Sequence, residues 1–315
     1  MTTTCTWATE KDKHELIDFI DFVFSKAHRP HNFATLLPKL YGEKGDAAPH
    51  HIVVREDGRI AGTMVAYPVT MHVAGEDVLT LGIGSVSVHP RSRGKGYMKL
   101  MMDAVDARAA ELGAMMAVLG GRRQRYEYFG YEKTGLELRA FLDGTNVRHA
   151  LRDVDTAGFD LVPMTEAHVP AALALQEGQT CYCRRKAEQF IDILRSWEAQ
   201  PLALTQGGRF LGYCALTGED VDELLLTDEA LALVALKLLS QRQEDLTLHA
   251  ALWEKERAAL LTRICESFQL LPDNQYKFYQ PERVKQLFSA LGEGELTWRG
   301  FTPSLPLYLP GPDRV

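Results

Sequence analysis

"SVSVHPRSRGKGYMKLMMDAV", residues 85–105, places a strand directly before a helix, with a strongly basic turn between them. Apolar residues alternate as far as Pro90, and an apolar pattern at helical spacing begins at Met98. Residues 91–96 contain two arginines, a lysine and two glycines. The first N–H groups of a helix lack intrahelical partners, and glycine lets an anion approach the backbone. The junction therefore predicts a site for a phosphate group, the alternative being a basic surface turn.

The flanking residues predict a mixed α/β fold. Residues 13–27 have apolar residues at helical spacing, and residues 50–90 alternate strand-like runs with turn signals at 56–58 and 75–77. We therefore expect a helix followed by three antiparallel strands. The helix after the junction should bury one face and stop at Gly113. That face consists of Met98, Met101, Val105, Ala109 and Leu112.

The basic turn does not fit the common nucleotide-binding loops. A P-loop requires GxxxxGK[ST], but Lys95 is followed by Gly96. The dinucleotide fingerprint GxGxxG fails because the third glycine position is Lys99 and the preceding strands read as antiparallel. The stretch instead resembles motif A of the GCN5-related N-acetyltransferases (GNAT), V-x-V-x-P-x-x-[RQ]-x-x-G-x-[GA].

Two alignments with this motif exist. The first places the motif on Val86, Val88, Pro90, Arg93 and Gly96, with Met98 in place of the final Gly or Ala. The second, built on Arg91, Gly94 and Gly96, fits the later positions but misplaces the proline. We use the first alignment.

The resemblance implies a GNAT fold, an α/β (α+β) fold with a mixed, mostly antiparallel sheet that splays at the acetyl-CoA site. Backbone groups of Val86, Ser87 and Val88 would hold the pantetheine arm of acetyl-CoA, the co-substrate, and no metal is implied. The pyrophosphate would lie on the N–H groups of Arg93, Gly94, Lys95, Gly96, Tyr97 and Met98.

A second motif follows. "RRQRYEYFGYEKTG" resembles the later family signature Y-x-x-x-G-[FY], with Tyr126, Gly130 and Tyr131 in register. In the family this first tyrosine stands near the thioester sulfur. A phenol with a pKa of about 10 can donate a proton to the departing thiolate at neutral pH. Tyr126 is therefore the expected general acid, the alternatives being a tyrosine buried for packing or Tyr128, which is out of register.

The general base stays open. Many relatives carry a carboxylate on the strand before motif A, where this chain has Gly84 and Ser85. The candidates are a water chain, His89, Glu127 and the terminal carboxylate of Val315.

Three segments, "NFATLLPKLYG" (residues 32–42), residues 83–102 and residues 119–135, look like the Eis-like (enhanced intracellular survival-like) branch. In that branch a degenerate acetyltransferase-like domain follows the working one. We expect a catalytic domain over residues 1–150, a linker at 151–158, a degenerate domain at 159–284 and a C-terminal tail at 285–315 that packs on the domains. In the second half, Asp228 and Glu229 stand at the strand-to-helix junction. They suit a helix N-terminus but would repel a pyrophosphate.

The acceptor loop should lie within residues 25–42. His28 and His31 are more consistent with loop residues than with ligands, because no third partner is visible. Phe33 and Tyr41 either line an acceptor pocket or fix the loop to the core.

Composition sets the remaining limits. The chain has 315 residues, 46% hydrophobic and 24% charged, with a net charge of −7. The acidic balance disfavours a nucleic-acid partner and suits an amine-bearing molecule. No signal peptide or membrane-spanning run is visible, and the five scattered cysteines fit reduced thiols, so we expect a cytoplasmic protein without a membrane partner. Cys181 and Cys183 could form half of a metal site, but no second pair stands at ligand spacing.

These observations favour an N-acetyltransferase that moves acetyl from acetyl-CoA to a primary amine of a small molecule or peptide, by direct attack in a ternary complex. The alternative is a non-catalytic acyl-CoA-binding regulatory protein of the same fold. The identity of the amine, and whether the protein forms a homo-oligomer as related proteins commonly do, stay open.

Overall fold

The structure is a computed structural model, and it describes residues 2–272, 274–291 and 311–313. Its contacts divide the chain into two compact units. The first contains Met1–Lys133 and Asn274–Leu287, and the second contains Thr134–Asp273 and Phe288–Asp313. The first segment of the first unit ends at residue 133, whereas the sequence predicts that the first domain ends at residue 150. Most of the expected tail, residues 292–310 and 314–315, lies outside the described residues.

The first unit is built on a mixed sheet in the order β1-β2-β3-β4-β5-β15-β6. The strands are β1 (Thr3–Trp7), β2 (His51–Glu56), β3 (Arg59–Val73), β4 (Glu76–Val88), β5 (Met116–Leu119), β15 (Asn274–Phe278) and β6 (Glu132–Thr134). The predicted meander is confirmed, since β2, β3 and β4 pair antiparallel in sequence order. Its two turns place Asp57–Gly58 and Ala74–Gly75 at positive φ, as two-residue hairpin loops require.

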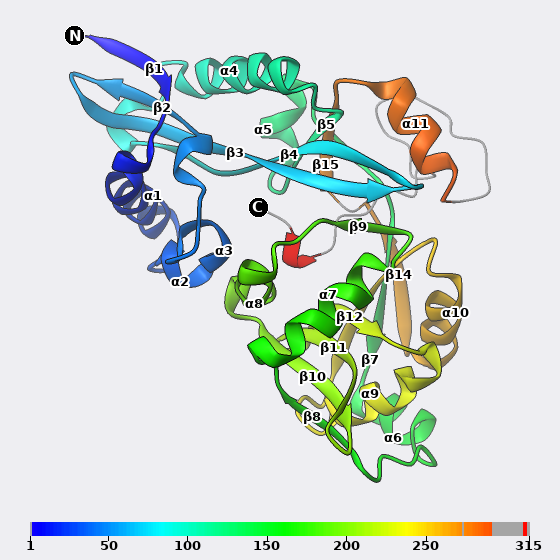
Figure 1. The fold of residues 1–315 in the computed structure, drawn as a ribbon. Helices are drawn as coiled ribbons and strands as arrows, with labels where there is room; N and C mark the ends of the chain where they lie inside the picture. The colour runs from blue at the N-terminus through cyan, green and yellow to red at the C-terminus, as the bar shows by residue number, and fades with distance from the viewer. Residues whose placement is uncertain (1, 273, 292–310, 314–315) are drawn as a thin grey trace. The chain divides into compact units, whose positions relative to one another are not determined.

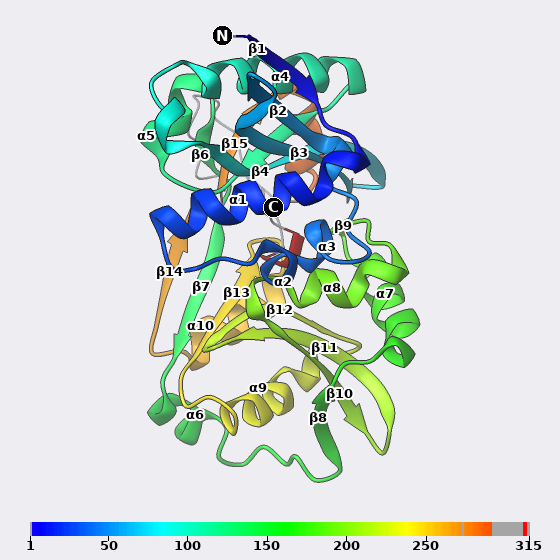
Figure 2. The same ribbon diagram turned by 90° about the vertical axis from the view of Figure 1, so that its left-hand side faces the viewer.

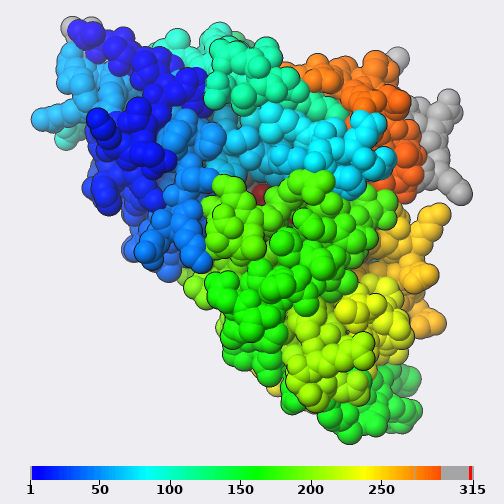
Figure 3. Space-filling model, viewed as in Figure 1, coloured from blue at the N-terminus to red at the C-terminus, as the bar shows by residue number. Residues whose placement is uncertain are grey.

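Helices cover both faces of this sheet. Helix α4 (Tyr97–Leu112) packs on one face, and α1 (Lys13–Ala27) packs on the other beside the short α2 (Phe33–Leu36) and α3 (Pro38–Tyr41), so that the sheet lies between α4 and α1 in both ribbon views (Figures 1 and 2). The outer side of α4 forms part of the surface (Figure 3). The short α5 (Arg123–Tyr126) follows β5, and α11 (Pro281–Ser289) follows β15.

Helix α4 matches its prediction closely. Met101, Val105 and Ala109 are fully buried, and Gly113 ends the helix at a φ of +67°. Leu112 differs from the prediction, because it is 40% exposed in the last turn of the helix.

The second unit has a sheet in the order β14-β7-β13-β12-β11-β10-β8. The strands of this sheet are β7 (Glu137–Leu142), β8 (Phe159–Pro163), β10 (Gln200–Gln206), β11 (Arg209–Thr217), β12 (Asp220–Leu226), β13 (Leu246–Ala251) and β14 (Ser267–Leu271). The short strand β9 (Cys181–Cys183) is not part of this sheet. Its helices are α6 (Gly144–Ala150), α7 (Val169–Glu177), α8 (Phe190–Leu194), α9 (Ala232–Ser240) and α10 (Lys255–Ile264).

The two sheets repeat one arrangement. In the first, three antiparallel strands lead through α4 to a parallel neighbour, β5; in the second, β10, β11 and β12 lead through α9 to the parallel β13. In both, a strand from elsewhere in the chain, β15 or β7, pairs antiparallel beyond the parallel one. The predicted α/β fold with a mixed, mostly antiparallel sheet, followed by a second, similar domain, is confirmed.

No helix of the described residues has both the length and the apolar character needed to cross a bilayer.

Candidate active site

The first sheet splays where β4 leaves β5. The two strands pair in parallel only where Thr80–Ile83 of β4 run beside Met116–Leu119 of β5. On its other edge β4 stays paired with β3 as far as Val88. Among the described residues, no strand pairs with the β5-side edge of β4 from residue 84 to 88. Residues 86–88, the predicted pantetheine site, therefore present an open strand edge that can pair with the amides of a ligand.

A β-bulge lies at the start of this open edge. Thr63 pairs with Ser87 and Val65 pairs with Gly84, so Met64 faces both Ser85 and Val86. Ser85 has a φ of +49°, which is uncommon for a residue other than glycine. A strained residue of this kind often marks a functional site, because the surrounding structure must hold it in place.

The turn after β4 offers a row of main-chain donors. Gly94 and Gly96 both have a φ of +80°, and a Cβ added to either would meet no atom within 4 Å. Gly96 is the N-cap of α4. No N–H group of residues 93–98 donates a hydrogen bond within the described part of the chain. These donors, the helix dipole and the open space above the glycines form a suitable cradle for a diphosphate.

Glu56, at the end of β2, organises this turn. Its carboxylate accepts hydrogen bonds from the Lys95 ammonium at 2.6 Å, the Ser92 hydroxyl at 3.1 Å and the Tyr97 hydroxyl. The hydrogen bond between Lys95 and Glu56 lowers the pKa of Glu56 and raises the pKa of Lys95. The Lys95 ammonium is thus bound to Glu56, whereas the main-chain N–H of Lys95 faces no partner among the described residues. The guanidinium groups of Arg91 and Arg93 are exposed and form no ion pair with a described residue.

Tyr126 ends α5 and is 6% exposed. Its ring packs edge-on against Tyr131, and it shares a core cluster with Ile83 and Leu119, the last paired residues of β4 and β5. Burial raises the pKa of Tyr126, while the Arg125 guanidinium opposes that shift. Tyr126 therefore remains protonated at neutral pH, as a proton donor must. Tyr128 is 75% exposed.

Two of the candidate general bases, His89 and Glu127, are held by contacts with neighbouring residues. The His89 ring stacks on Phe22, and its Nδ1 accepts the Arg91 N–H at 3.2 Å. Glu127 pairs with Arg123 at 3.2 Å. The third candidate residue, Val315, lies outside the described residues, and a water chain stays a prediction.

The described part of the chain contains no group of three His, Cys, Asp or Glu residues able to hold a metal ion. Cys181 and Cys183 are buried free thiols in β9. His28 and His31 belong to an aromatic cluster with Phe24.

Phe33 and Tyr41 attach the segment of residues 25–42 to the core. Phe33 and Tyr41 are 1% and 4% exposed and pack edge-on against each other. The Tyr41 hydroxyl reaches the bulge, 2.7 Å from Ser85 Oγ, and lies 3.0 Å from His51 Nε2. The side-chain contacts of Glu56, His51 and Ser85 leave no motif in the sequence, because the residues that they contact are distant along the chain.

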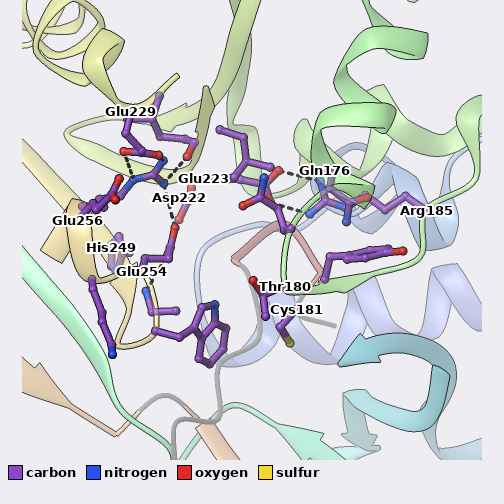
Figure 4. Close-up of a pocket in the computed structure, with 18 residues that line it drawn as sticks. Gln176, Thr180, Cys181, Arg185, Asp222, Glu223, Glu229, His249, Glu254 and Glu256 are labelled. Atoms are coloured by element: carbon purple, nitrogen blue, oxygen red, sulfur yellow. Dashed lines mark hydrogen bonds and ion pairs between the residues drawn. The ribbon is translucent and has the colours of Figure 1, made fainter. Parts of the chain in front are cut away.

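The second unit splays at the equivalent place, but different side chains line the opening. Strands β12 and β13 pair in parallel only at Asp220–Thr247 and Val221–Leu248. Beyond this point lies a cavity of about 360 Å³ lined by residues of both strands. Arg257 of α10 donates to the Leu224 carbonyl, on β12, and pairs with Glu229 and Glu254, whose carboxylates converge in Figure 4.

The junction after β12 is also already capped. The Asp228 carboxylate accepts the Ala230 N–H at 2.9 Å, so it serves the helix end as the sequence suggests. The Leu224 carbonyl on the strand edge and the Ala230 N–H at the helix start are therefore both bound within the second unit.

Comparisons with known proteins agree with this geometry. Residues 6–134 match the sequence model of the "Acetyltransferase (GNAT) domain" family. A probable N-acyltransferase from Enterococcus faecalis V583 has a TM-score of 0.68 at 14% identity, with 91% of this chain and 75% of that chain covered. Eis1 from Mycobacterium abscessus has a TM-score of 0.61 at 13% identity, with 91% and 76% covered.

N-myristoyltransferase from Saccharomyces cerevisiae, solved with bound myristoyl-CoA, has a TM-score of 0.51 at 13% identity, with 88% and 82% covered. At these identities the similarity establishes the fold. A search of curated proteins gave no match. The matched residues, 6–134, hold both predicted motifs and form an acetyltransferase domain of the GNAT superfamily.

Proposed function

We propose that this protein transfers acetyl from acetyl-CoA to a primary amine of a small molecule or peptide. The GNAT domain supports acyl transfer in general, and the acetyl donor and the amine acceptor are our proposal. The observation that carries it is the open edge of β4, which runs directly into a turn whose N–H groups have no acceptor among the residues that the structure describes. One continuous stretch thus offers a strand edge for amides and a cradle for a diphosphate.

In this proposal the main chain does most of the cofactor binding. Val86, Ser87 and Val88 pair with the pantetheine amides as a neighbouring strand would. The N–H groups of residues 93–98 hold the pyrophosphate, and Arg93 adds an uncommitted guanidinium. Lys95 contributes through its N–H, because its ammonium is held by Glu56.

Transfer then proceeds by direct attack in a ternary complex. The amine nitrogen bonds to the thioester carbon, and the tetrahedral intermediate collapses when its C–S bond breaks. Tyr126 donates its phenolic proton to the departing sulfur. The nitrogen releases one proton to solvent, and the Tyr126 phenolate takes one proton from solvent, so the phenol is restored. General acid catalysis of this kind contributes about 10²- to 10⁴-fold.

The test is a thiol-release assay with acetyl-CoA against a panel of amines. Tyr126→Phe should lower kcat by about 10²-fold or more while leaving coenzyme A affinity unchanged. Tyr128→Phe is the matched control, because it removes a phenol from the same turn at an exposed position. It should leave kcat unchanged.

Two outcomes would count against the proposal. Equal rates for wild type and Tyr126→Phe would remove Tyr126 from the chemistry. Tight coenzyme A binding without thiol release for any amine would instead indicate a non-catalytic acyl-CoA-binding protein.

A further inference from the structure

Four side chains on the α1 side of the first sheet form a hydrogen-bond chain that ends at the bulge. Thr63 Oγ1 lies 2.9 Å from both the Ile52 carbonyl oxygen and His51 Nδ1. His51 Nε2 lies 3.0 Å from the Tyr41 hydroxyl, which lies 2.7 Å from Ser85 Oγ. His51 and Thr63 are fully buried, and Tyr41 is 4% exposed, so solvent does not compete for the bonds among these three side chains.

The direction of the chain follows from counting protons. Thr63 has one hydroxyl proton and donates it to the Ile52 carbonyl, so it must accept from His51 Nδ1–H. Burial lowers the pKa of His51 to about 3, so the ring is neutral and Nε2 carries no proton. Nε2 therefore accepts the single proton of the Tyr41 hydroxyl.

The Tyr41 oxygen can then only accept from Ser85, whose hydroxyl proton is used in that bond. Ser85 Oγ has no other partner among the described residues and is half-buried. It thus keeps acceptor capacity and has no proton left to donate. Its position is equally constrained, because Ser85 lies at the bulge with a φ of +49° and directly precedes the open edge of β4.

We propose that Ser85 is a positioning residue that accepts an N–H hydrogen bond from the attacking amine, and that the chain Thr63–His51–Tyr41 keeps it an acceptor. A hydroxyl free to rotate could donate to the amine lone pair and block attack. A hydroxyl held as an acceptor takes an amine proton and leaves the lone pair free for the thioester carbon. Ser85 does not remove the proton in this role. The inference rests on the proposed function.

The first test reads the direction of the chain without activity. Nitrogen-15 NMR of the His51 ring should show a protonated Nδ1 and an unprotonated Nε2 at neutral pH. The opposite tautomer would make Tyr41 a donor to Ser85 and would overturn the inference, whatever the enzyme does.

The second test uses Ser85→Gly, because glycine adopts a positive φ without strain and lacks the hydroxyl. Loss of one hydrogen bond to the amine should lower kcat/KM for the amine about tenfold, with coenzyme A affinity unchanged. Tyr41→Phe keeps Ser85 but frees its proton, and should also lower kcat/KM for the amine. Tyr67→Phe is the control, because it breaks a comparable hydroxyl bond, 2.6 Å to Asp46, outside the chain. It should leave kcat/KM unchanged.

The outcomes separate the two proposals. Absence of thiol release in the wild type would overturn the proposed function. Thiol release in the wild type that is unchanged in Ser85→Gly would overturn only the role of Ser85. An equal loss in Tyr67→Phe and Tyr41→Phe would reduce the effect to general loosening of the loop and would also overturn that role.

Discussion

His51 and Tyr126 show how burial acts on two titratable groups of the first unit. Burial lowers the pKa of His51 and raises the pKa of Tyr126, because it disfavours the charged form of each. Both side chains are therefore neutral at physiological pH. For Tyr126 this keeps a proton available to donate, and for His51 it keeps Nε2 available to accept.

The buried His51 predicts that stability is lost in mild acid. Its pKa is about 3 in the folded protein, against about 6.5 in the unfolded chain. Below about pH 6.5 only the unfolded chain takes up this proton, so stability present above that pH is lost progressively as the pH falls toward 3. His51 should account for about 2 kcal/mol of unfolding free energy lost between about pH 7 and about pH 5.

Urea unfolding of wild type and His51→Gln at the two pH values measures this loss. Glutamine stays neutral at both, so the variant should lose about 2 kcal/mol less than wild type on acidification. Equal losses of unfolding free energy in the two proteins would show that the folded protein protonates His51 as readily as the unfolded chain does.

At the scale of elements, the turn between β4 and α4 depends on glycine for its backbone conformation. Gly96→Ala should lower the free energy of unfolding by about 1 kcal/mol, because alanine is strained at a φ of +80°. It should also weaken coenzyme A binding by disturbing the donor row. Calorimetry and thermal unfolding check the two effects separately.

Gly58→Ala is the matched control for that variant. Gly58 has a φ of +83° in the β2–β3 hairpin, and a Cβ there also meets no atom within 4 Å. It should cost similar stability and leave coenzyme A affinity unchanged. If both variants weaken binding equally, the turn is not the cradle.

These elements also show what sequence could predict. The α1 limits, the meander and the glycine-rich turn follow from local patterns such as helical spacing and turn residues. The pairing of Lys95 with Glu56 joins residues 39 apart, and β15 enters the first sheet from the far end of the chain. Neither leaves a local pattern, so the Glu56 contacts and the Ser85–Tyr41–His51 chain could be found only in the structure.

At the scale of the whole molecule, the same strand–helix–strand arrangement occurs twice with opposite chemistry at its splay. In the first unit no described residue pairs with the β5-side edge of β4 at residues 84–88 or accepts from the N–H groups of residues 93–98. In the second, Arg257 binds the strand edge and Asp228 caps the helix. Duplication of the fold therefore does not imply duplication of the cofactor site.

Calorimetry of the full chain with coenzyme A should accordingly give one binding event per chain. Arg93→Gln should weaken that event about tenfold, because a guanidinium–phosphate contact is lost. Glu229→Gln is the matched control at the second junction, where it removes a carboxylate without providing a cradle, so stoichiometry and affinity should stay unchanged. Two events in the wild type, or a gain of binding in Glu229→Gln, would mean that the second splay also accepts the cofactor. A single event sensitive to Glu229→Gln and not to Arg93→Gln would move the site to the second unit, since each substitution alters the charge at only one of the two junctions.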